Sequence, residues 1–256
     1  MKNKKEGGEL KMKKTITVIC CEPSASVYLN GINKNLTVDS SSKARSTLIN
    51  QSKKANNLKI YDLKTKSQMK CLLAEVSKES KVNLGLQKIV KKGGNELASK
   101  NVVSGKYYLV VDGEGDANTY IKKPIKDWKK NNKENFERIK DNTYIVINNP
   151  CLEYYFLLHF ADKHLSCGNA DKMLTELKKH WEGYDKKKDT ISKKIETLDK
   201  EYEVFKKNIK NHAIELYTSS IGDILNKDNS FWSDLLPSTS MGQLVDDYIK
   251  KQSKKA

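Results

Sequence analysis

Three acidic residues stand on alternate positions of one short stretch: Asp112, Glu114 and Asp116, each separated from the next by a glycine. Carboxylates this close together repel one another and raise each other's pKa unless they share a cation. Oxygen ligands of this kind suit a hard ion such as Mg²⁺. A solvated acidic turn would have the same composition, and this stretch by itself leaves both interpretations open.

A calcium loop of the EF-hand type is excluded for this stretch. Such a loop beginning at Asp112 needs a glycine at its sixth position and a glutamate at its twelfth. The chain has Ala117 and Lys123 at these positions.

Short apolar strands are the elements that must position these acids. Residues 107–111 are an unbroken β-prone run, typical of a strand buried on both faces in a parallel sheet. A second such run covers residues 15–21 and ends on Glu22, and a third, residues 144–147, leads to Asn149. Strands that alternate with helices pair in parallel through right-handed crossovers, so their carboxyl ends share one edge of the sheet. We therefore expect the acids and Asn149 to converge at that edge.

A buried helix is predicted after the third strand. Asn149 is a favoured cap and Pro150 a favoured first helical residue, and residues 151–160 are apolar on nearly every side. Glu153 and His159 interrupt this run. Because a buried carboxylate without a partner costs several kcal/mol by order of magnitude, Glu153 is either a structural ion-pair partner or part of a site. A histidine such as His159 is more often a satisfied core residue than a ligand.

The composition indicates the kind of partner. The chain has 256 residues, with 48 lysines and arginines against 32 acids and a formal charge of +16, which attracts polyanions such as nucleic acid. The codon bias of an AT-rich genome would also account for this lysine excess. No run has the length of a membrane span, so we expect no membrane association. The five cysteines are scattered without a CxxC pair and residues 1–14 lack an apolar leader, so we expect a cytoplasmic protein with reduced thiols.

We expect three regions along the chain. Residues 1–14 are a basic flexible arm, residues 15–165 an α/β core with a parallel sheet flanked by helices, and residues 166–256 a helical C-terminal region packed on that core. Within the core, the apolar residues of 82–90 have helical spacing. Beyond residue 170 the pattern predicts helices only, among them a long one over residues 205–225.

Several motifs of the chain resemble those of one protein family. A strand that ends in Glu, followed by a strand that ends in an acid-x-acid turn, is similar to the Toprim domain of topoisomerases, primases and overcoming-lysogenization-defect nucleases. More closely, the chain resembles the RloB-like family of prokaryotic restriction and defence loci over residues 15–250. The matching pieces are Cys21–Glu22 with Tyr28–Leu29, Val110–Glu114, Asn149–Phe160, Gly183–Lys187 (a Tyr-x-Lys element), Ala213–Ile214, Pro237–Thr239 and Leu244–Val245.

This resemblance implies a Toprim-like α/β fold with a C-terminal helical extension. It also implies a Mg²⁺- or Mn²⁺-dependent nuclease that cleaves RNA such as tRNA, or DNA, in antiviral defence, beside an ATPase partner from the same locus. The implied metal ligands are Glu22, Asp112, Glu114 and Asp116. The implied catalytic residues are Glu22, Glu153 and Lys187, with Lys186 as the alternative to Lys187. Asn149 and His159 would contact the metal ligands and catalytic residues and hold them in position.

Two departures from the family pattern leave a second function open. The family usually follows its first Glu with glycine, a further Glu and a Thr-Glu pair, whereas Glu22 is followed by Pro-Ser-Ala-Ser, and the turn has Glu114 in place of Asp. Both changes could shift the metal or weaken catalysis. The alternative is a degenerate Toprim module that binds nucleic acid or an ATPase partner without cleavage, and a homo-oligomer is compatible with either function. A topoisomerase or primase is disfavoured, because the chain has no room for a strand-gating domain and no zinc ribbon.

Overall fold

The computed structural model describes most of the region between residues 16 and 246. The described ranges are 16–35, 58–62, 69–82, 84–90, 96–103, 105–161, 169–186, 188–212, 214–215, 219–233 and 237–246. The predicted N-terminal arm, residues 1–14, and Lys187 lie outside them. Within these ranges, no helix combines the length and the apolar character that crossing a bilayer requires.

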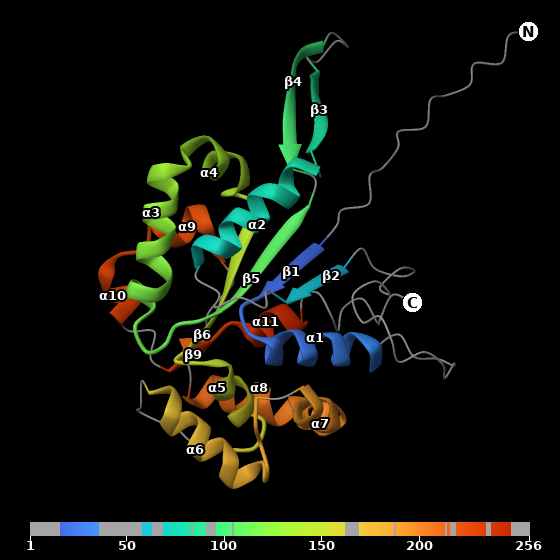
Figure 1. The fold of residues 1–256 in the computed structure, drawn as a ribbon, viewed down its shortest axis with the longest axis vertical. Helices are drawn as coiled ribbons and strands as arrows, with labels where there is room; N and C mark the ends of the chain where they lie inside the picture. Colours follow the sequence, from blue (N-terminus) through green and yellow to red (C-terminus); the bar gives the residue numbers. More distant parts are fainter. Residues whose placement is uncertain are drawn as a thin grey trace, which may run out of the picture.

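A seven-stranded mixed sheet forms the centre of the molecule (Figure 1). Its four longer strands are β1 (Ile16–Cys20), β2 (Leu58–Asp62), β5 (Lys106–Asp112) and β6 (Thr143–Asn149). They run parallel in the order β2-β1-β5-β6. Three two-residue strands complete the sheet, β7 (Ile214–Glu215), β8 (Ser219–Ser220) and β9 (Ser238–Thr239). The predicted α/β class, with a mostly parallel sheet flanked by helices, is confirmed.

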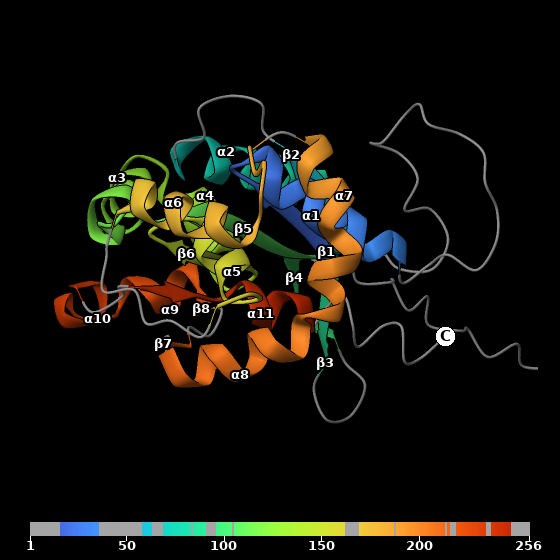
Figure 2. The same cartoon turned by 90° about the horizontal axis from the view of Figure 1, so that it is seen from below.

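Helices cover both faces of this sheet, as Figures 1 and 2 show. One face carries α1 (Pro23–Asn35), α5 (Leu152–Leu157), α6 (Ala170–His180), α7 (Lys188–Lys200), α8 (Tyr202–His212) and α11 (Met241–Leu244). The other carries α2 (Met69–Val82), the π-helix η1 (Asn118–Lys122), α3 (Lys123–Asn131), α4 (Lys133–Ile139), α9 (Ile221–Leu225) and α10 (Asn229–Ser233).

The side chains of β5 explain why both faces are covered. Tyr108 and Val110 belong to the core cluster beneath the first set of helices, whereas Leu109 and Val111 belong to the cluster beneath the second. Successive side chains of a strand point to opposite faces, so an unbroken apolar strand must be buried on both sides.

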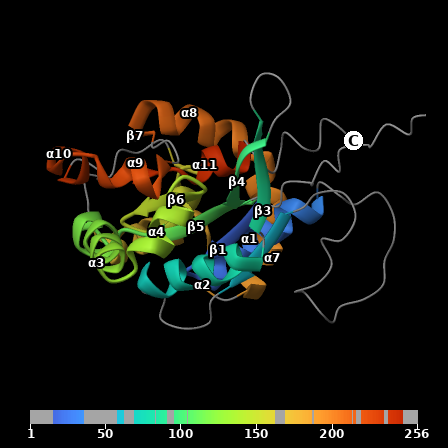
Figure 3. The same ribbon diagram turned by 90° about the horizontal axis from the view of Figure 1, so that it is seen from above.

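The C-terminal region adds strands as well as helices to the fold. β8 and β9 pair antiparallel with β6, and β7 pairs with β9, so the prediction of helices only beyond residue 170 was wrong. Two-residue strands are too short to show a period, and their partner in the sheet decides their conformation. The helix predicted over residues 205–225 is interrupted for the same reason, because β7 and β8 lie between α8 and α9. Figure 3 shows α8, α9 and α11 gathered on the β6 side of the sheet.

A separate hairpin projects from the body of the molecule (Figure 1). Its strands, β3 (Leu84–Val90) and β4 (Glu96–Val103), pair antiparallel. The helix predicted over residues 82–90 is therefore wrong, since α2 ends at Val82 and a strand follows. A short apolar run fits both the helical and the strand period, and here the pairing with β4 decides.

The helix after β6 begins later than predicted. The Asn149–Pro150 peptide bond is cis, Cys151 takes the N-cap position, and α5 begins at Leu152. Asn149 is thus the last residue of β6 and not a helix cap. Its side-chain oxygen accepts a hydrogen bond from the Gly115 amide instead.

Candidate active site

Strand register brings Glu22 beside the acidic turn. Cys20 of β1 pairs with Val110 of β5, and the amide of Cys21 donates to the Val110 carbonyl oxygen over 3.0 Å. Glu22 follows directly, and Asp112 stands two residues beyond Val110. Both carboxylates therefore lie at the carboxyl edge of the parallel strands, where open α/β sheets place their ligands.

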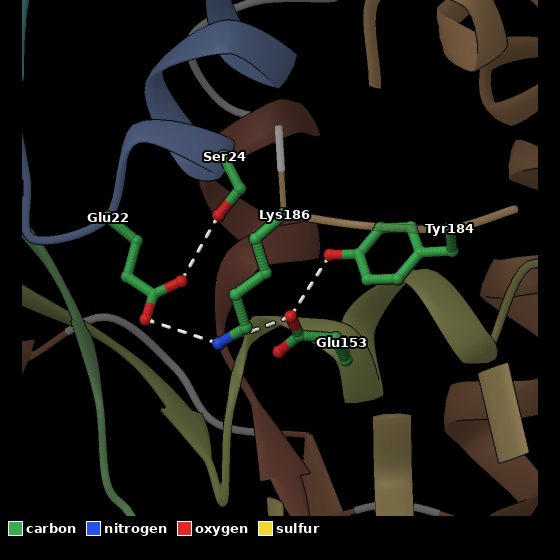
Figure 4. A network of polar contacts seen from close by, with 5 residues as sticks. All are labelled: Glu22, Ser24, Glu153, Tyr184 and Lys186. Carbon is green, nitrogen blue, oxygen red and sulfur yellow. Dashed lines mark hydrogen bonds and ion pairs between the residues drawn. The ribbon is translucent and has the colours of Figure 1, made fainter. Parts of the chain in front are cut away.

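Glu22 occupies the junction between β1 and α1. The amide of Ala25 donates to the Glu22 carbonyl oxygen over 3.2 Å, in the first turn of α1. Ser24 Oγ donates to Glu22 Oε2 over 3.2 Å. This hydroxyl holds one carboxylate oxygen, while Oε1 faces the site (Figure 4).

Backbone and side-chain hydrogen bonds hold the acidic turn against the end of β6. The Gly113 amide donates to the Asn148 carbonyl oxygen over 2.7 Å. The Asn149 side-chain oxygen accepts a hydrogen bond from the Gly115 amide over 3.1 Å. Glu114 has a φ of 52° and Gly115 a φ of 82°, the left-handed region that glycine adopts without penalty. Asn149 therefore fixes the turn that carries Asp112.

Glu153 projects from the first turn of α5 into the same region and is only 1% exposed. Tyr184 donates its hydroxyl to Glu153 Oε1 over 3.0 Å. Among the described residues, neither Glu153 Oε2 nor Asp112 Oδ2, both buried, has a hydrogen-bond partner. Leaving a buried carboxylate oxygen in this state is costly unless a proton or a cation joins it.

A lysine stands between two of these carboxylates. Lys186 Nζ lies 3.4 Å from Glu22 Oε1 and 3.4 Å from Glu153 Oε1 (Figure 4). Lys186 belongs to the segment between α6 and α7, and its side chain is 48% exposed. Lys187, the lysine predicted for catalysis, lies outside the described residues. Lys186, the predicted alternative to Lys187, contacts both carboxylates.

Crowding of negative charge governs the electrostatics of the site. Burial raises the pKa of Asp112 well above its ordinary value of 3.8, and the charges of Glu22 and Glu153 raise it further, against the effect of Lys186. The pKa of Glu114 is also raised, first by burial and then by Glu22. Burial alone would lower the pKa of Lys186, but the charges of Glu153, Glu22 and Asp112 outweigh burial and raise it. A further cation would offset the remaining negative charge.

Asp116 and His159 are engaged in other contacts. Asp116 Oδ1 accepts a hydrogen bond from the Thr119 amide over 3.0 Å, and the hydrogen bonds from Thr119 lower the pKa of Asp116. The His159 ring stacks on Phe205 with centroids 4.9 Å apart, and its Nδ1 lies 3.0 Å from the Tyr155 carbonyl oxygen. Asp116 thus caps the start of a helix, and His159 is part of the aromatic core between α5 and α8.

The donor set of this site fits a hard divalent ion in its chemistry. Glu22, Asp112 and Glu114 offer carboxylate oxygens, the ligands that Mg²⁺ and Mn²⁺ prefer. The buried Asp112 Oδ2, without a hydrogen-bond partner among the described residues, is an oxygen that such an ion would satisfy. In the described ranges, however, no three Asp, Glu, His or Cys side chains are already arranged to hold one ion.

Sequence reasoning missed two contacts of the site. Ser24 donates a hydrogen bond to Glu22, and Tyr184 donates one to Glu153. A signal existed for the tyrosine, because Tyr184 and Lys186 have the spacing of the Tyr-x-Lys element. No signal existed for Ser24, since a serine in the first turn of a helix is common for reasons unrelated to a site.

Fold and site together define an α/β protein in which carboxylates and Lys186 gather at the carboxyl edge of the parallel strands. The sequence profile of RloB-like proteins matches residues 17–247. The chain belongs to the RloB-like protein family. Comparisons with curated proteins and with solved structures find no match.

Proposed function

We propose that the chain is a divalent-metal-dependent nuclease that hydrolyses phosphodiester bonds. The observation that carries this proposal is the meeting of Glu22, Asp112 and Glu153 at one edge of the sheet, although they come from distant parts of the chain. Buried carboxylates that share a site and have perturbed pKa values are typical of functional sites. The resemblance of the motifs to those of the RloB-like family supports the same activity.

Mg²⁺ or Mn²⁺ is the ion that we propose for this site. Glu22, Asp112 and Glu114 would hold it, because they combine carboxylate chemistry with mutual electrostatic contact. When bound, such an ion neutralises phosphate charge and makes a water molecule more nucleophilic.

The side chains of the chain itself have separate roles in this proposal. Glu22 accepts a proton from the attacking water, since one of its oxygens faces the site. Glu153, oriented by the hydrogen bond from Tyr184, is the group that we propose to relay a proton from solvent to the leaving oxygen. The Lys186 ammonium stabilises the negative charge that develops on the phosphate.

Nucleic acid, either RNA such as tRNA or DNA, is the substrate class that we propose. The chain runs from the acidic turn into η1 and α3, where Tyr120 is 52% exposed. Lys123, Lys126 and Lys130 are exposed as well, and their spacing of three and four residues places them on one face of α3, away from the buried Ile125. Such a face can follow a phosphate backbone while an aromatic ring stacks on a base.

A cleavage assay tests this function directly. The purified chain is incubated with plasmid, single-stranded DNA or tRNA in the presence of Mg²⁺ or Mn²⁺, and with a chelator as the blank. We expect cleavage that needs the ion and that falls at least ~100-fold in Asp112→Asn. Asp127→Asn is the matched control, because Asp127 is a half-exposed acid on α3 whose ion pair with Lys70, 3.8 Å long, lies at the surface. Cleavage that survives Asp112→Asn would overturn the proposal.

The biological setting follows from the family resemblance. We propose antiviral defence inside the cell, together with an ATPase partner from the same locus. Sequencing of the cleaved ends, after expression of the chain in infected and uninfected cells, identifies the target and shows whether cleavage depends on infection. Cleavage at equal rates in both conditions would contradict a defence role.

A binding module without cleavage is the second candidate. It is favoured by the position of Lys186 between Glu22 and Glu153, and by the lack of a ready-made ion-binding cluster in the described ranges. This candidate predicts nucleic-acid binding of equal strength in Mg²⁺ and in chelator. It also predicts no cleavage and no heat on titration with Mn²⁺.

A further inference from the structure

The Lys186 ammonium lies between two carboxylates of the candidate site and pairs with Glu22, one of the proposed metal ligands. It lies 3.4 Å from one oxygen of Glu22 and 3.4 Å from one oxygen of Glu153. Glu22 follows β1 and Glu153 lies in the first turn of α5, so Lys186 joins two separate parts of the chain (Figure 4).

One ammonium does not balance the charge that surrounds it. Glu22, Asp112 and Glu153 carry three negative charges when ionised, against the single positive charge of Lys186. Oxygens on Asp112 and Glu153 stay buried without hydrogen-bond partners among the described residues. A divalent ion would satisfy these oxygens better than the lysine does, because it brings twice the charge and accepts several oxygen ligands.

Lys186 is also the member of this network that can leave most easily. Glu153 is 1% exposed, whereas the Lys186 side chain is 48% exposed. The preceding segment contains Gly183, which has a φ of 69° and open space around the position of a Cβ. A half-exposed lysine on such a segment can turn into solvent by changing rotamers, while the carboxylates stay with their strands and helix.

We infer that Lys186 is a resident cation of the candidate site, and that a divalent metal ion held by Glu22, Asp112 and Glu114 must displace it from its ion pair with Glu22. This inference rests on the proposed metal-dependent function and adds a competition within the site. It separates two states of the protein: without the ion the lysine holds the carboxylates together, and with the ion the ammonium is released at the rim, where substrate phosphates arrive.

Calorimetric titration of the full chain with Mn²⁺ tests the competition without any measurement of activity. Lys186→Gln removes the charge at similar length, and we expect it to bind Mn²⁺ about tenfold more tightly than the wild-type chain. Lys186→Arg keeps the charge and should bind no more tightly than wild type. Lys178→Gln, at an exposed lysine of α6, is the control and should match wild type.

Each outcome of the titration decides the inference. Tighter binding by Lys186→Gln alone, or binding by this variant when wild type shows none, supports it. Equal or weaker binding by Lys186→Gln overturns it, as does a lack of binding by every variant. Circular dichroism melting establishes that the variants are folded, and if Lys186→Gln does not fold, Lys186→Met takes its place under the same criteria.

The inference and the proposed nuclease can fail separately. If wild type cleaves nucleic acid only with metal while Lys186→Gln binds Mn²⁺ no better, the competition is wrong and the nuclease stands. If Lys186→Gln binds Mn²⁺ more tightly but no substrate is cleaved, the competition stands and the nuclease is wrong.

Discussion

Tyr184 donates its hydroxyl to Glu153 Oε1 over 3.0 Å, and both side chains are buried. The tyrosine comes from the segment after α6 and the glutamate from α5, so the bond joins the C-terminal region to the edge of the sheet. The same Glu153 oxygen also pairs with the charged Lys186 ammonium, 3.4 Å away.

We expect Tyr184→Phe to lower both the nuclease activity and the stability of the chain. The change removes one hydrogen bond to a buried carboxylate, which costs about 1–3 kcal/mol of stability. Because Glu153 then loses its fixed orientation, kcat should fall by about 10-fold or more, with little change in KM. Steady-state kinetics and urea unfolding measure the two effects. Tyr144→Phe, near the start of β6 and so at the opposite end of the strand from the site, serves as the control. Wild-type kcat in Tyr184→Phe would contradict the role assigned to Tyr184.

Asp112→Asn should make the metal-free protein more stable at neutral pH. Burial raises the folded-state pKa of Asp112 above 3.8. The charges of Glu22, Glu153 and Glu114 raise this pKa further, whereas the charge of Lys186 lowers it. The folded chain therefore binds more protons than the unfolded chain between that value and the raised pKa, and wild-type stability falls as pH rises through this window. The asparagine does not titrate, so its advantage should be small below pH 3.8 and full above the raised pKa.

Urea unfolding at a series of pH values measures this difference. The advantage of Asp112→Asn should grow as the pH rises from 3.8 towards neutrality. Addition of Mg²⁺ should stabilise wild type and leave Asp112→Asn unchanged. A variant that is less stable than wild type at neutral pH, without metal, would show that Asp112 is not under the predicted strain.

Gly113→Ala should disturb the acidic turn through Asn149. A Cβ at position 113 would overlap the Asn149 side chain, which is buried and bonded to the Gly115 amide. We expect a loss of about 1–3 kcal/mol of stability. In a double-mutant cycle, Asn149→Ala should remove part of the overlap, so the double variant should lose less stability than the sum of the single variants. Strict additivity would mean that the two residues do not act on one another.

The lysines of α3 should contribute to nucleic-acid binding through the phosphate backbone. We expect the triple change of Lys123, Lys126 and Lys130 to Gln to weaken binding of a single-stranded oligonucleotide in chelator. The logarithm of the association constant falls as the logarithm of the salt concentration rises, and this slope should become less steep by about 0.7 for each phosphate contact that is lost. Fluorescence anisotropy at several salt concentrations measures both quantities.

A matched set of exposed lysines controls for net charge in this experiment. Lys172, Lys178 and Lys179 are exposed on α6, and their triple change to Gln removes the same charge from another surface. An equal loss of affinity in both triple variants would assign binding to overall charge and not to α3.

The arrangement of the site could be predicted from the sequence where an acidic residue comes directly after an apolar strand run. The apolar runs before Glu22 and Asp112 predict parallel strands, and β1 and β5 pair in parallel with their ends together. Glu153 was predictable as a buried acid, because it interrupts an apolar run, and it is 1% exposed. The metal and catalytic roles of these residues remain predictions.

Other features depend on partners that a local pattern does not contain. Asp116 has the same spacing from Glu114 as Asp112 does, yet its contact with Thr119 turns it into a helix cap. The strands β8 and β9 exist because β6 offers them an edge, and their own two residues carry no period. Leu84–Val90 forms a strand because β4 lies beside it.

The contact between Lys186 and Glu22 spans 164 positions of the sequence, and this separation has a consequence for synthesis on the ribosome. The strands that carry Glu22, Asp112 and Asn149 emerge well before the lysine, and β9 emerges later still. A nascent or prematurely terminated chain therefore presents the acids without their counter-charge and without the outer strands of the sheet. We expect the contact between Lys186 and Glu22 to form late in folding, since closing a loop of this length costs more entropy than forming local contacts.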